Sequence, residues 1–355
     1  MRILFSLTFV ALLAGCAELG YYWHSARGHL AIMEKRVPIT ELLASAKLDQ
    51  DLRRQLVLVR EIRAFSIERL ALSKSGSYTD YAQLDRPYAL QNLFATPEFS
   101  TKLLSWCYPI AGCTSYRGFY QQARLEAFVD ELKKENNEFH VTMVPAYSTL
   151  GWFDDPVLSS FIDWPEFRLA GLLFHELTHQ RIYIDGDTRF NESLATAVQQ
   201  VGTRLWLNSR QQHDELERFN RSIAYRQDIV LTIESIRNQL AEVYKLDQSD
   251  EYKREQKQRL FQSARQQYQD IASRHDYRDG FEYWFTAELN NAKLASVSTY
   301  NALVPNFISM IEAFDHDFHR FFDYVDSIGD LHRDKRIRCL EEWQSGNAVK
   351  HPACS

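Results

Sequence analysis

The sequence lacks the clustered positive charge that marks nucleic-acid-binding surfaces. Its 41 lysine and arginine residues are spread among 47 acidic residues over 355 positions, and the formal net charge is −6. A nucleic-acid interface needs cations gathered on one face to neutralise phosphates. The composition therefore excludes nucleic acid as an expected partner. With 45% hydrophobic and 13% aromatic residues, the chain can bury a large core and is not expected to be disordered.

Long apolar runs are missing beyond the N-terminus, so no transmembrane helix is expected there. At the N-terminus, Arg2 supplies a positive charge, and Ile3 to Ala14 form an apolar stretch that is too short to span a bilayer. The stretch leads to Leu-Ala-Gly-Cys ending at Cys16, which resembles the bacterial lipoprotein signal. In that signal the cysteine becomes the first mature residue and carries acyl groups. An ordinary secretory signal, with Cys16 incidental, is the alternative.

Lipidation at Cys16 would anchor the protein to a membrane, since each buried methylene contributes about 0.8 kcal/mol. We therefore expect a signal peptide over residues 1–15, a lipid-proximal tether over 16–38 and a folded domain over 39–355. Ala17 stands where an inner-membrane retention signal usually has Asp. The resemblance to lipoproteins thus implies the outer membrane of a Gram-negative cell envelope, with the protein facing the periplasm.

Cysteine is scarce, and none of the five cysteines forms a CxxC pair of the redox or zinc-ribbon kind. Apart from Cys16 the chain has Cys107, Cys113, Cys339 and Cys354. An even number in an oxidising compartment predicts two disulfides. Pairing of Cys107 with Cys113 and of Cys339 with Cys354 is the simplest connectivity. Buried free thiols are the alternative.

Glycine and proline are absent from Thr203 to Asp279, where apolar residues recur at helical steps. The polar segment Asp247 to Asp250 interrupts this pattern, which predicts a helical hairpin at about 206–275. The hairpin can pack on the domain with its charges in solvent, or serve as a partner-binding arm. Elsewhere the patterns predict helices over 39–73 and 117–134 and strands over 139–144 and 147–153. The expected fold is mainly α with a small mixed β-sheet.

One short motif, His175-Glu176-Leu177-Thr178-His179, carries chemistry. Asp163 as N-cap, with Glu166 as its capping-box partner, is predicted to start the helix that contains it. His175 and His179 are four apart, so they share one helix face and can bind one metal ion. Glu176 lies about 100° round the helix, where it can reach a water beside the metal. This arrangement is typical of zinc hydrolases.

The surroundings of the motif favour a metal site over a chance match. The helix is strongly apolar from Leu169 to Phe174, and burying two imidazoles and a carboxylate there without a shared partner would be costly. A turn at 185–187 is followed by a second helical run that contains Glu192. This carboxylate can complete a His₂Glu site for Zn²⁺ with one open position.

HExxH followed by Asn191-Glu192-x-x-Ala195 resembles the gluzincins, in which a Glu on the next helix is the third zinc ligand. Twelve residues separate His179 from Glu192, fewer than is usual in the aminopeptidase and thermolysin-like branches. The whole mature chain is similar to the proteobacterial putative zinc aminopeptidase lipoproteins. The similarity covers the zinc motif, Tyr21-Tyr22-Trp23, Tyr147 to Pro156, and Leu289 to Leu294.

The resemblance implies a zincin-like metallopeptidase core, a peptide substrate and Glu176 as the catalytic base and acid. Tyr300 is the candidate oxyanion donor, with an ordinary core tyrosine as the alternative. The strand over 147–153 resembles the edge strand along which gluzincins bind substrate, so Gly151, Trp152 and Asp154 are candidate substrate-binding residues. Asp154 or Asp155 can hold a substrate amino group, or either can serve the turn before Pro156.

The sequence thus favours a membrane-anchored zinc-dependent peptidase, an aminopeptidase, that hydrolyses peptide bonds in the periplasm. The alternative is a zinc-containing envelope assembly or quality-control factor that acts mainly by binding. A third hypothesis is a lipoprotein scaffold in which the hairpin binds partners and the HExxH match is fortuitous. The effect of Glu176→Gln separates the first two, and metal analysis separates the third from both.

Overall fold

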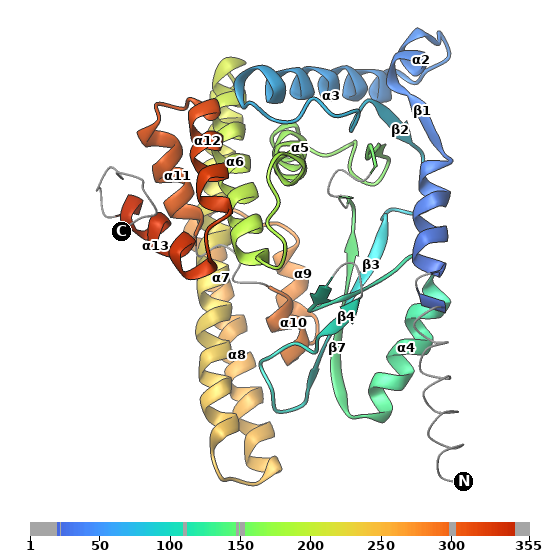
Figure 1. The fold of residues 1–355 in the computed structure, drawn as a ribbon. Coiled ribbons are helices and arrows are strands. Elements are labelled where there is room, and N and C mark those ends of the chain that lie inside the picture. The colour runs from blue at the N-terminus through green and yellow to red at the C-terminus, as the bar shows by residue number, and fades with distance from the viewer. Residues whose placement is uncertain are drawn as a thin grey trace, which may run out of the picture.

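The computed structural model of the protein describes residues 20–21, 23–108, 112–146, 149, 153–297 and 303–344. These residues are mainly helical with small sheets, as the sequence predicts (Figure 1). The helices are α2 (Ile39–Ala44), α3 (Gln50–Arg69), α4 (Gln122–Lys134), α5 (Glu166–Arg181), α6 (Thr188–Ser209), α7 (His213–Lys245), α8 (Asp250–His275), α9 (Phe281–Thr286), α10 (Asn291–Ser296), α11 (Val304–Ala313), α12 (Phe318–Gly329) and α13 (Arg333–Gln344). Residues 20–21 and 23–33 are also helical and are called the N-terminal helix. No helix in the described part of the chain is both long and apolar enough to cross a membrane.

The strands form small sheets, one of which is mixed. They are β1 (Arg36–Pro38), β2 (Asp80–Ala82), β3 (Leu90–Pro97), β4 (Trp106–Tyr108), β5 (Gly112–Thr114), β6 (Arg117–Phe119), β7 (Asn137–Val144) and β8 (Val157–Leu158). In the order β1-β2-β8, β2 pairs with β1 antiparallel and with β8 parallel. The order β6-β3-β7 is antiparallel throughout and includes the predicted strand over 139–144. One face of this second sheet packs on α4, and the other packs on α10.

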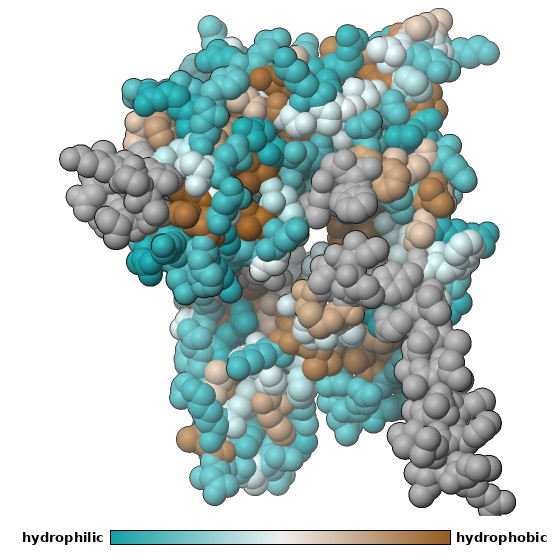
Figure 2. Space-filling view, viewed as in Figure 1, coloured by the Kyte–Doolittle hydropathy of each residue, from teal (hydrophilic) through white to brown (hydrophobic). Residues whose placement is uncertain are grey.

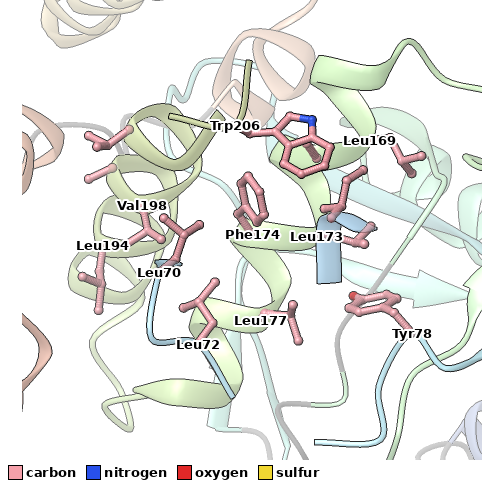
Figure 3. Packing of buried hydrophobic residues seen from close by; sticks show 14 of the residues in the cluster. Leu70, Leu72, Tyr78, Leu169, Leu173, Phe174, Leu177, Leu194, Val198 and Trp206 are labelled. Atoms are coloured by element: carbon pink, nitrogen blue, oxygen red, sulfur yellow. The ribbon is translucent and has the colours of Figure 1, made fainter. Parts of the chain in front are cut away.

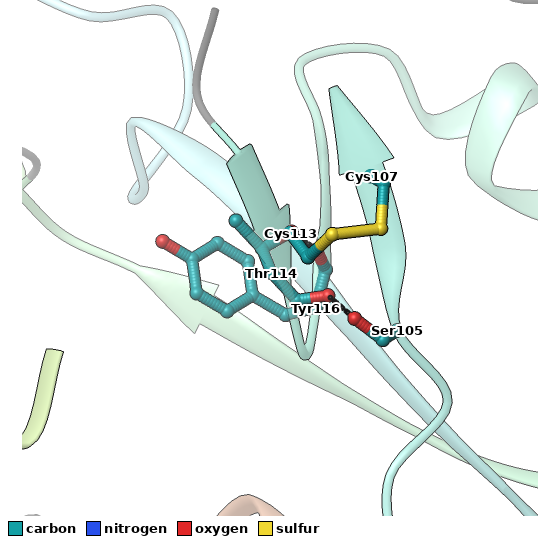
Figure 4. The surroundings of a disulfide bond; sticks show 5 residues. All are labelled: Ser105, Cys107, Cys113, Thr114 and Tyr116. Carbon is teal, nitrogen blue, oxygen red and sulfur yellow. Dashed lines mark hydrogen bonds between the residues drawn. A yellow bond between two sulfur atoms is a disulfide. The ribbon is translucent and has the colours of Figure 1, made fainter. Parts of the chain in front are cut away.

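A disulfide joins Cys107 and Cys113, as predicted, in the two-stranded sheet of β4 and β5 (Figure 4). The two cysteines are direct partners in the antiparallel register, so their side chains lie on the same face. Cys354 lies outside the described residues, and its pairing with Cys339 stays a prediction. Cys16 also lies outside them.

The main core surrounds α5, which lies between α3 and α6 (Figures 1 and 3). Phe174 and Leu177 are fully buried among side chains of α6 and of the segment that follows α3; these include Leu70, Leu72, Leu194, Val198 and Trp206. Full burial of each such apolar side chain contributes about 2 kcal/mol. The helix that carries the HExxH motif is therefore held rigidly on its apolar side.

Two local predictions are wrong. Helix α5 begins at Glu166 with Pro165 as its N-cap residue, and no side chain caps it, so Asp163 and Glu166 form no capping box. The residue before a proline is disfavoured in helical conformation, which keeps the helix from starting earlier. Glu166 instead accepts hydrogen bonds from Trp206 and Gln212 at 2.9 and 3.0 Å. The predicted helix over 117–134 is likewise shorter, because 117–119 pair with β3 as strand β6.

Helices α7 and α8 form the long hairpin, which begins at His213 because α6 extends to Ser209. The hairpin packs against the domain through α10 and β7, where buried Lys257 forms an ion pair with Glu138. Arg254 also pairs with Glu98 at 2.6 Å. Hydrophilic residues cover most of the hairpin in the view of Figure 2. This arrangement matches the packing alternative, in which the charges of the hairpin face solvent.

Candidate metal centre

A short turn between α5 and α6 brings the two helices side by side. Gly186 has a φ of +74°, a left-handed conformation that glycine adopts without strain. The buried side chain of Asn191 links the two ends of the turn. Its Oδ1 accepts a hydrogen bond from the Ile184 N–H at 2.9 Å, and its Nδ2 donates one to the Ile184 carbonyl at 2.8 Å. Asp187 caps α6 through the Phe190 N–H. These contacts fix the first turns of α6, where Glu192 lies.

The structure brings the three predicted ligands together. The Nε2 atoms of His175 and His179 are 3.2 Å apart. The carboxylate of Glu192 lies 3.4 Å from His175 Nε2 through one oxygen and 3.6 Å from His179 Nε2 through the other. All three ligand atoms lie within 4.8 Å of one another. The shorter loop between HExxH and the third ligand therefore still lets the carboxylate reach both rings.

Gln199 contacts the other side of the His175 ring. Its Oε1 lies 3.1 Å from His175 Nδ1. Gln199 follows Glu192 by seven residues, two helical turns, so both side chains project from the same face of α6. Gly171, one turn before His175 on α5, makes room for it: a Cβ there would meet Gln199 Nε2 at 3.2 Å. One face of α6 thus contacts both ring nitrogens of His175.

The side chains present fit a bound zinc ion. The amide oxygen of Gln199 can only accept a hydrogen bond, so in the neutral ring Nδ1 of His175 carries the proton and Nε2 presents a lone pair. Glu192 also offers only acceptors. Three converging acceptors repel one another unless a cation lies between them. Two imidazole nitrogens and one carboxylate oxygen are the donor set of His₂Glu zinc sites.

The pKa values show the mutual repulsion of the protonated rings. Burial, together with the charge of His175, lowers the pKa of His179 to about 4. For His175 burial acts in the same direction, but the hydrogen bond to Glu192 and the charges of Glu176 and Glu192 outweigh it, so its pKa is raised. Burial, reinforced by Glu192 and Asp155, raises the pKa of Glu176 to about 7. Two imidazolium ions at this distance cannot coexist, whereas two neutral rings can share a cation.

A polar network joins the end of the HExxH motif to the segment before β8. Gln180, next to His179, donates to Ser77 Oγ at 3.0 Å, and that same oxygen accepts from the Asp155 N–H at 2.9 Å. Asp155 is 4% exposed, and its carboxylate accepts from the Thr149 N–H at 2.9 Å. Asp154, in contrast, is exposed. Of the two candidates for an amino-group contact, Asp155 is the one whose charge acts on Glu176.

The sequence does not predict a role for two residues that lie near the candidate metal ligands. Gln199 could have been noticed only from its seven-residue spacing to Glu192. Tyr183 follows His179 by four residues, and its ring lies edge-on to the His179 ring with centroids 6.3 Å apart. Tyr183 is 43% exposed, so it is a hydroxyl-bearing side chain at an accessible edge of the centre. Its spacing after HExxH was a usable signal.

Three predicted site residues, Gly151, Trp152 and Tyr300, lie outside the described residues. The predicted substrate strand over 147–153 lies there as well, except for Thr149 and Phe153. Their roles, and that of Asp154 in substrate binding, stay predictions.

One protein-family match covers all the residues of the candidate metal centre. A protein-family model described as "Putative aminopeptidase" matches residues 20–340, which include the N-terminal helix, HExxH and Glu192. No curated protein matches the chain, and no solved structure does.

Proposed function

The chain belongs to the putative aminopeptidase family, and on this basis we propose that it is a zinc-dependent aminopeptidase. Family membership supports a peptidase with a peptide substrate. The observation that carries the zinc proposal is the convergence of the Nε2 atoms of His175 and His179 and the carboxylate of Glu192 on one point beside Glu176. With both rings neutral, this set favours a cation, because it brings three mutually repelling acceptors together.

His175, His179 and Glu192 would hold the ion. When bound, zinc supplies a Lewis acid that polarises a scissile carbonyl and acidifies an adjacent water. Gln199 keeps the lone pair of His175 Nε2 directed at the ion by accepting the Nδ1 proton. The apolar packing of α5 and the turn bracketed by Asn191 keep the two helices, and so the ligands, in register.

Glu176 is the proton carrier of the proposed reaction. It follows His175 directly on α5, so its carboxylate lies beside the ligands without being one of them. Glu176 takes a proton from the attacking water and holds it at a carboxylate oxygen. It then donates this proton to the nitrogen of the leaving peptide. A tyrosine hydroxyl, Tyr300 in our proposal, donates a hydrogen bond to the developing oxyanion.

We place the enzyme at the periplasmic side of a bacterial membrane, held by a lipid on Cys16. The order Leu-Ala-Gly-Cys after a short apolar stretch supports this location. The Cys107–Cys113 disulfide also supports it, because such bonds persist in oxidising compartments.

The test uses the mature chain, purified without chelators and analysed for bound metal. It is then incubated with matched peptides that have free or acetylated N-termini. We expect one zinc ion per chain and cleavage only of peptides with a free N-terminus. Equal cleavage of both peptides would contradict the aminopeptidase assignment, and absence of zinc would contradict the metallopeptidase assignment. Retained zinc without hydrolysis of any peptide would favour the envelope binding factor.

A further inference from the structure

The C-terminal helices α12 and α13 hold both ends of the α5–α6 turn, the turn that places Glu192 beside the histidines. Arg181, the last residue of α5, forms an ion pair with Asp326 of α12 at 3.0 Å. Asp187, the N-cap residue of α6, forms an ion pair with Arg336 of α13 at 2.8 Å. The turn is therefore tied to helices near the opposite end of the described chain, drawn in red in Figure 1.

The pair between Arg336 and Asp187 is buried and tightly bonded. Arg336 is 6% exposed and Asp187 is 4% exposed. Nη2 of Arg336 donates to the Asp187 carboxylate, and Nη1 donates to the carbonyls of Gly329 and Leu331, at 2.7 Å each. The guanidinium also lies 5.5 Å from the ring centre of Phe190. A planar guanidinium with this many partners is fixed in orientation, so it sets the position of the Asp187 carboxylate.

Hydrogen bonds carry this position into α6. The Asp187 carboxylate accepts from the Phe190 N–H at 3.3 Å, and the Asp187 carbonyl accepts from the Asn191 N–H at 3.1 Å. Glu192 follows Asn191 directly, in the second turn of the helix. A shift of Asp187 would therefore move the backbone of Glu192.

We propose that Arg336 is a positioning residue for the metal centre, because it holds Asp187 and thereby keeps Glu192 within reach of both histidines. This inference rests on the proposed function, since Glu192 matters in it as a zinc ligand. Without Arg336 the Asp187 carboxylate would be buried with no counter-charge, which is strongly unfavourable. The start of α6 would move so that this carboxylate reaches water, and Glu192 would move with it.

The first measurement is the zinc affinity of the mature chain carrying Arg336→Met, by competition with a chromogenic chelator. We expect affinity roughly tenfold weaker than that of the unmodified protein, as for other partners that orient metal ligands. Arg336→Lys keeps the charge but not the planar fork, so its loss should be smaller. The lysine variant also carries the test if the methionine variant does not fold.

Co²⁺ in place of Zn²⁺ gives a second measurement, because its visible absorption spectrum depends on the coordination geometry. The spectrum should change in Arg336→Met, since one ligand has moved. A pair that only stabilises the fold would leave the spectrum of the folded protein unchanged. Unchanged zinc affinity together with an unchanged cobalt spectrum would overturn the proposal.

Lys257→Met is the matched control, because Lys257 is 4% exposed and forms another buried ion pair, with Glu138, in the packing of the hairpin. Urea unfolding should show lower stability in this variant, as in Arg336→Met. Zinc affinity and the cobalt spectrum should stay those of the unmodified protein. An equal loss of zinc affinity in this control would reflect general loosening of the fold and would overturn the proposal.

A double variant tests whether Arg336 acts through Asp187. Asn is a good N-cap residue, so Asp187→Asn removes the charge and keeps the cap. The loss of zinc affinity in Asp187→Asn/Arg336→Met should be smaller than the product of the two single losses, because each single change breaks the same pair. Losses that simply multiply would show that the two residues act separately, against the proposal.

The unmodified protein separates this inference from the proposed function. If it binds no zinc, the proposed function fails and the inference fails with it. If it binds zinc and folded Arg336→Met binds zinc equally tightly, only the positioning role of Arg336 is refuted.

Discussion

The amide oxygen of Gln199 lies 3.1 Å from Nδ1 of His175, on the opposite side of the ring from the nitrogen that faces Glu192. Both partners of this ring come from α6, two turns apart. An amide holds the imidazole tautomer without adding charge, unlike a carboxylate at the same place. Gln199 is thus a positioning residue for the proposed zinc site.

Gln199→Leu should lower zinc affinity about ten- to 100-fold, because His175 loses the partner that fixes its ring. Competition with a chromogenic chelator measures this directly. Gln199→Glu keeps an acceptor at the same place and should bind zinc at least as tightly as the unmodified protein. Unchanged affinity in the leucine variant would show that the contact only packs the two helices together.

Glu176→Gln should lower turnover by a factor of at least about 10², because the amide cannot carry the proton. The variant should still bind one zinc ion per chain. Peptide cleavage and metal analysis on the same sample measure the two effects. Glu192→Gln is the companion variant and should lose zinc together with activity. A Glu176→Gln protein that cleaves normally would exclude this residue as the proton carrier.

Asn191→Ala should destabilise the protein by about 2 kcal/mol, since the Ile184 N–H and carbonyl both lose a buried partner. It should also weaken zinc binding, because the first turn of α6 loses its link to the preceding turn. Asn306→Ala is the matched control: Asn306 is another buried amide and donates to the Leu340 carbonyl at 2.9 Å. Urea unfolding and zinc titration should show lower stability in both variants but weaker zinc binding only in Asn191→Ala.

His140 should make the protein sensitive to mild acid. Burial, with the nearby charge of Lys293 on α10, lowers the pKa of His140 from 6.5 to about 4. Between these values the unfolded chain binds the proton and the folded one does not, so stability falls as the pH falls from 6.5 toward 4. The loss approaches about 3 kcal/mol at the lower end.

His140→Gln removes this titration, so its unfolding free energy should fall less over that range than that of the unmodified protein. Urea unfolding at several pH values gives the comparison. His332→Gln, at a histidine exposed on the surface, is the control and should follow the unmodified protein. Parallel curves for His140→Gln and the unmodified protein would mean that His140 is already solvated.

The convergence of the three candidate metal ligands could be predicted from the sequence largely because its geometry is local. The spacing of His175 and His179 fixes their common face whatever the helix packs against, and a helix restarting after a glycine turn limits where Glu192 can lie. The partnership of Gln199 depends on how α5 and α6 pack against each other, with Gly171 leaving room for the Gln199 side chain. The seven-residue spacing to Glu192 puts Gln199 on the same face of α6 but does not predict how the two helices pack.

Other features could not be predicted from the sequence because long-range contacts override the local sequence signals. Asp163 and Glu166 have capping-box spacing, but Pro165 and the bonds of Glu166 to Trp206 and Gln212 move the helix start. Residues 117–119 continue a helical pattern, yet β3 recruits them as a strand. The contact between Arg124 and His24 joins segments 100 residues apart, which no pattern along the chain relates.

The tight α5–α6 turn confines the ligands and their supporting amide to one uninterrupted stretch, residues 175–199. Evolution can therefore lengthen surface loops, permute the chain ends or replace the long hairpin without separating the ligand set. An insertion between Gln180 and Asn191 is the exception, since even a few added residues would carry Glu192 away from both imidazoles. Intolerance to insertion should be concentrated in that interval.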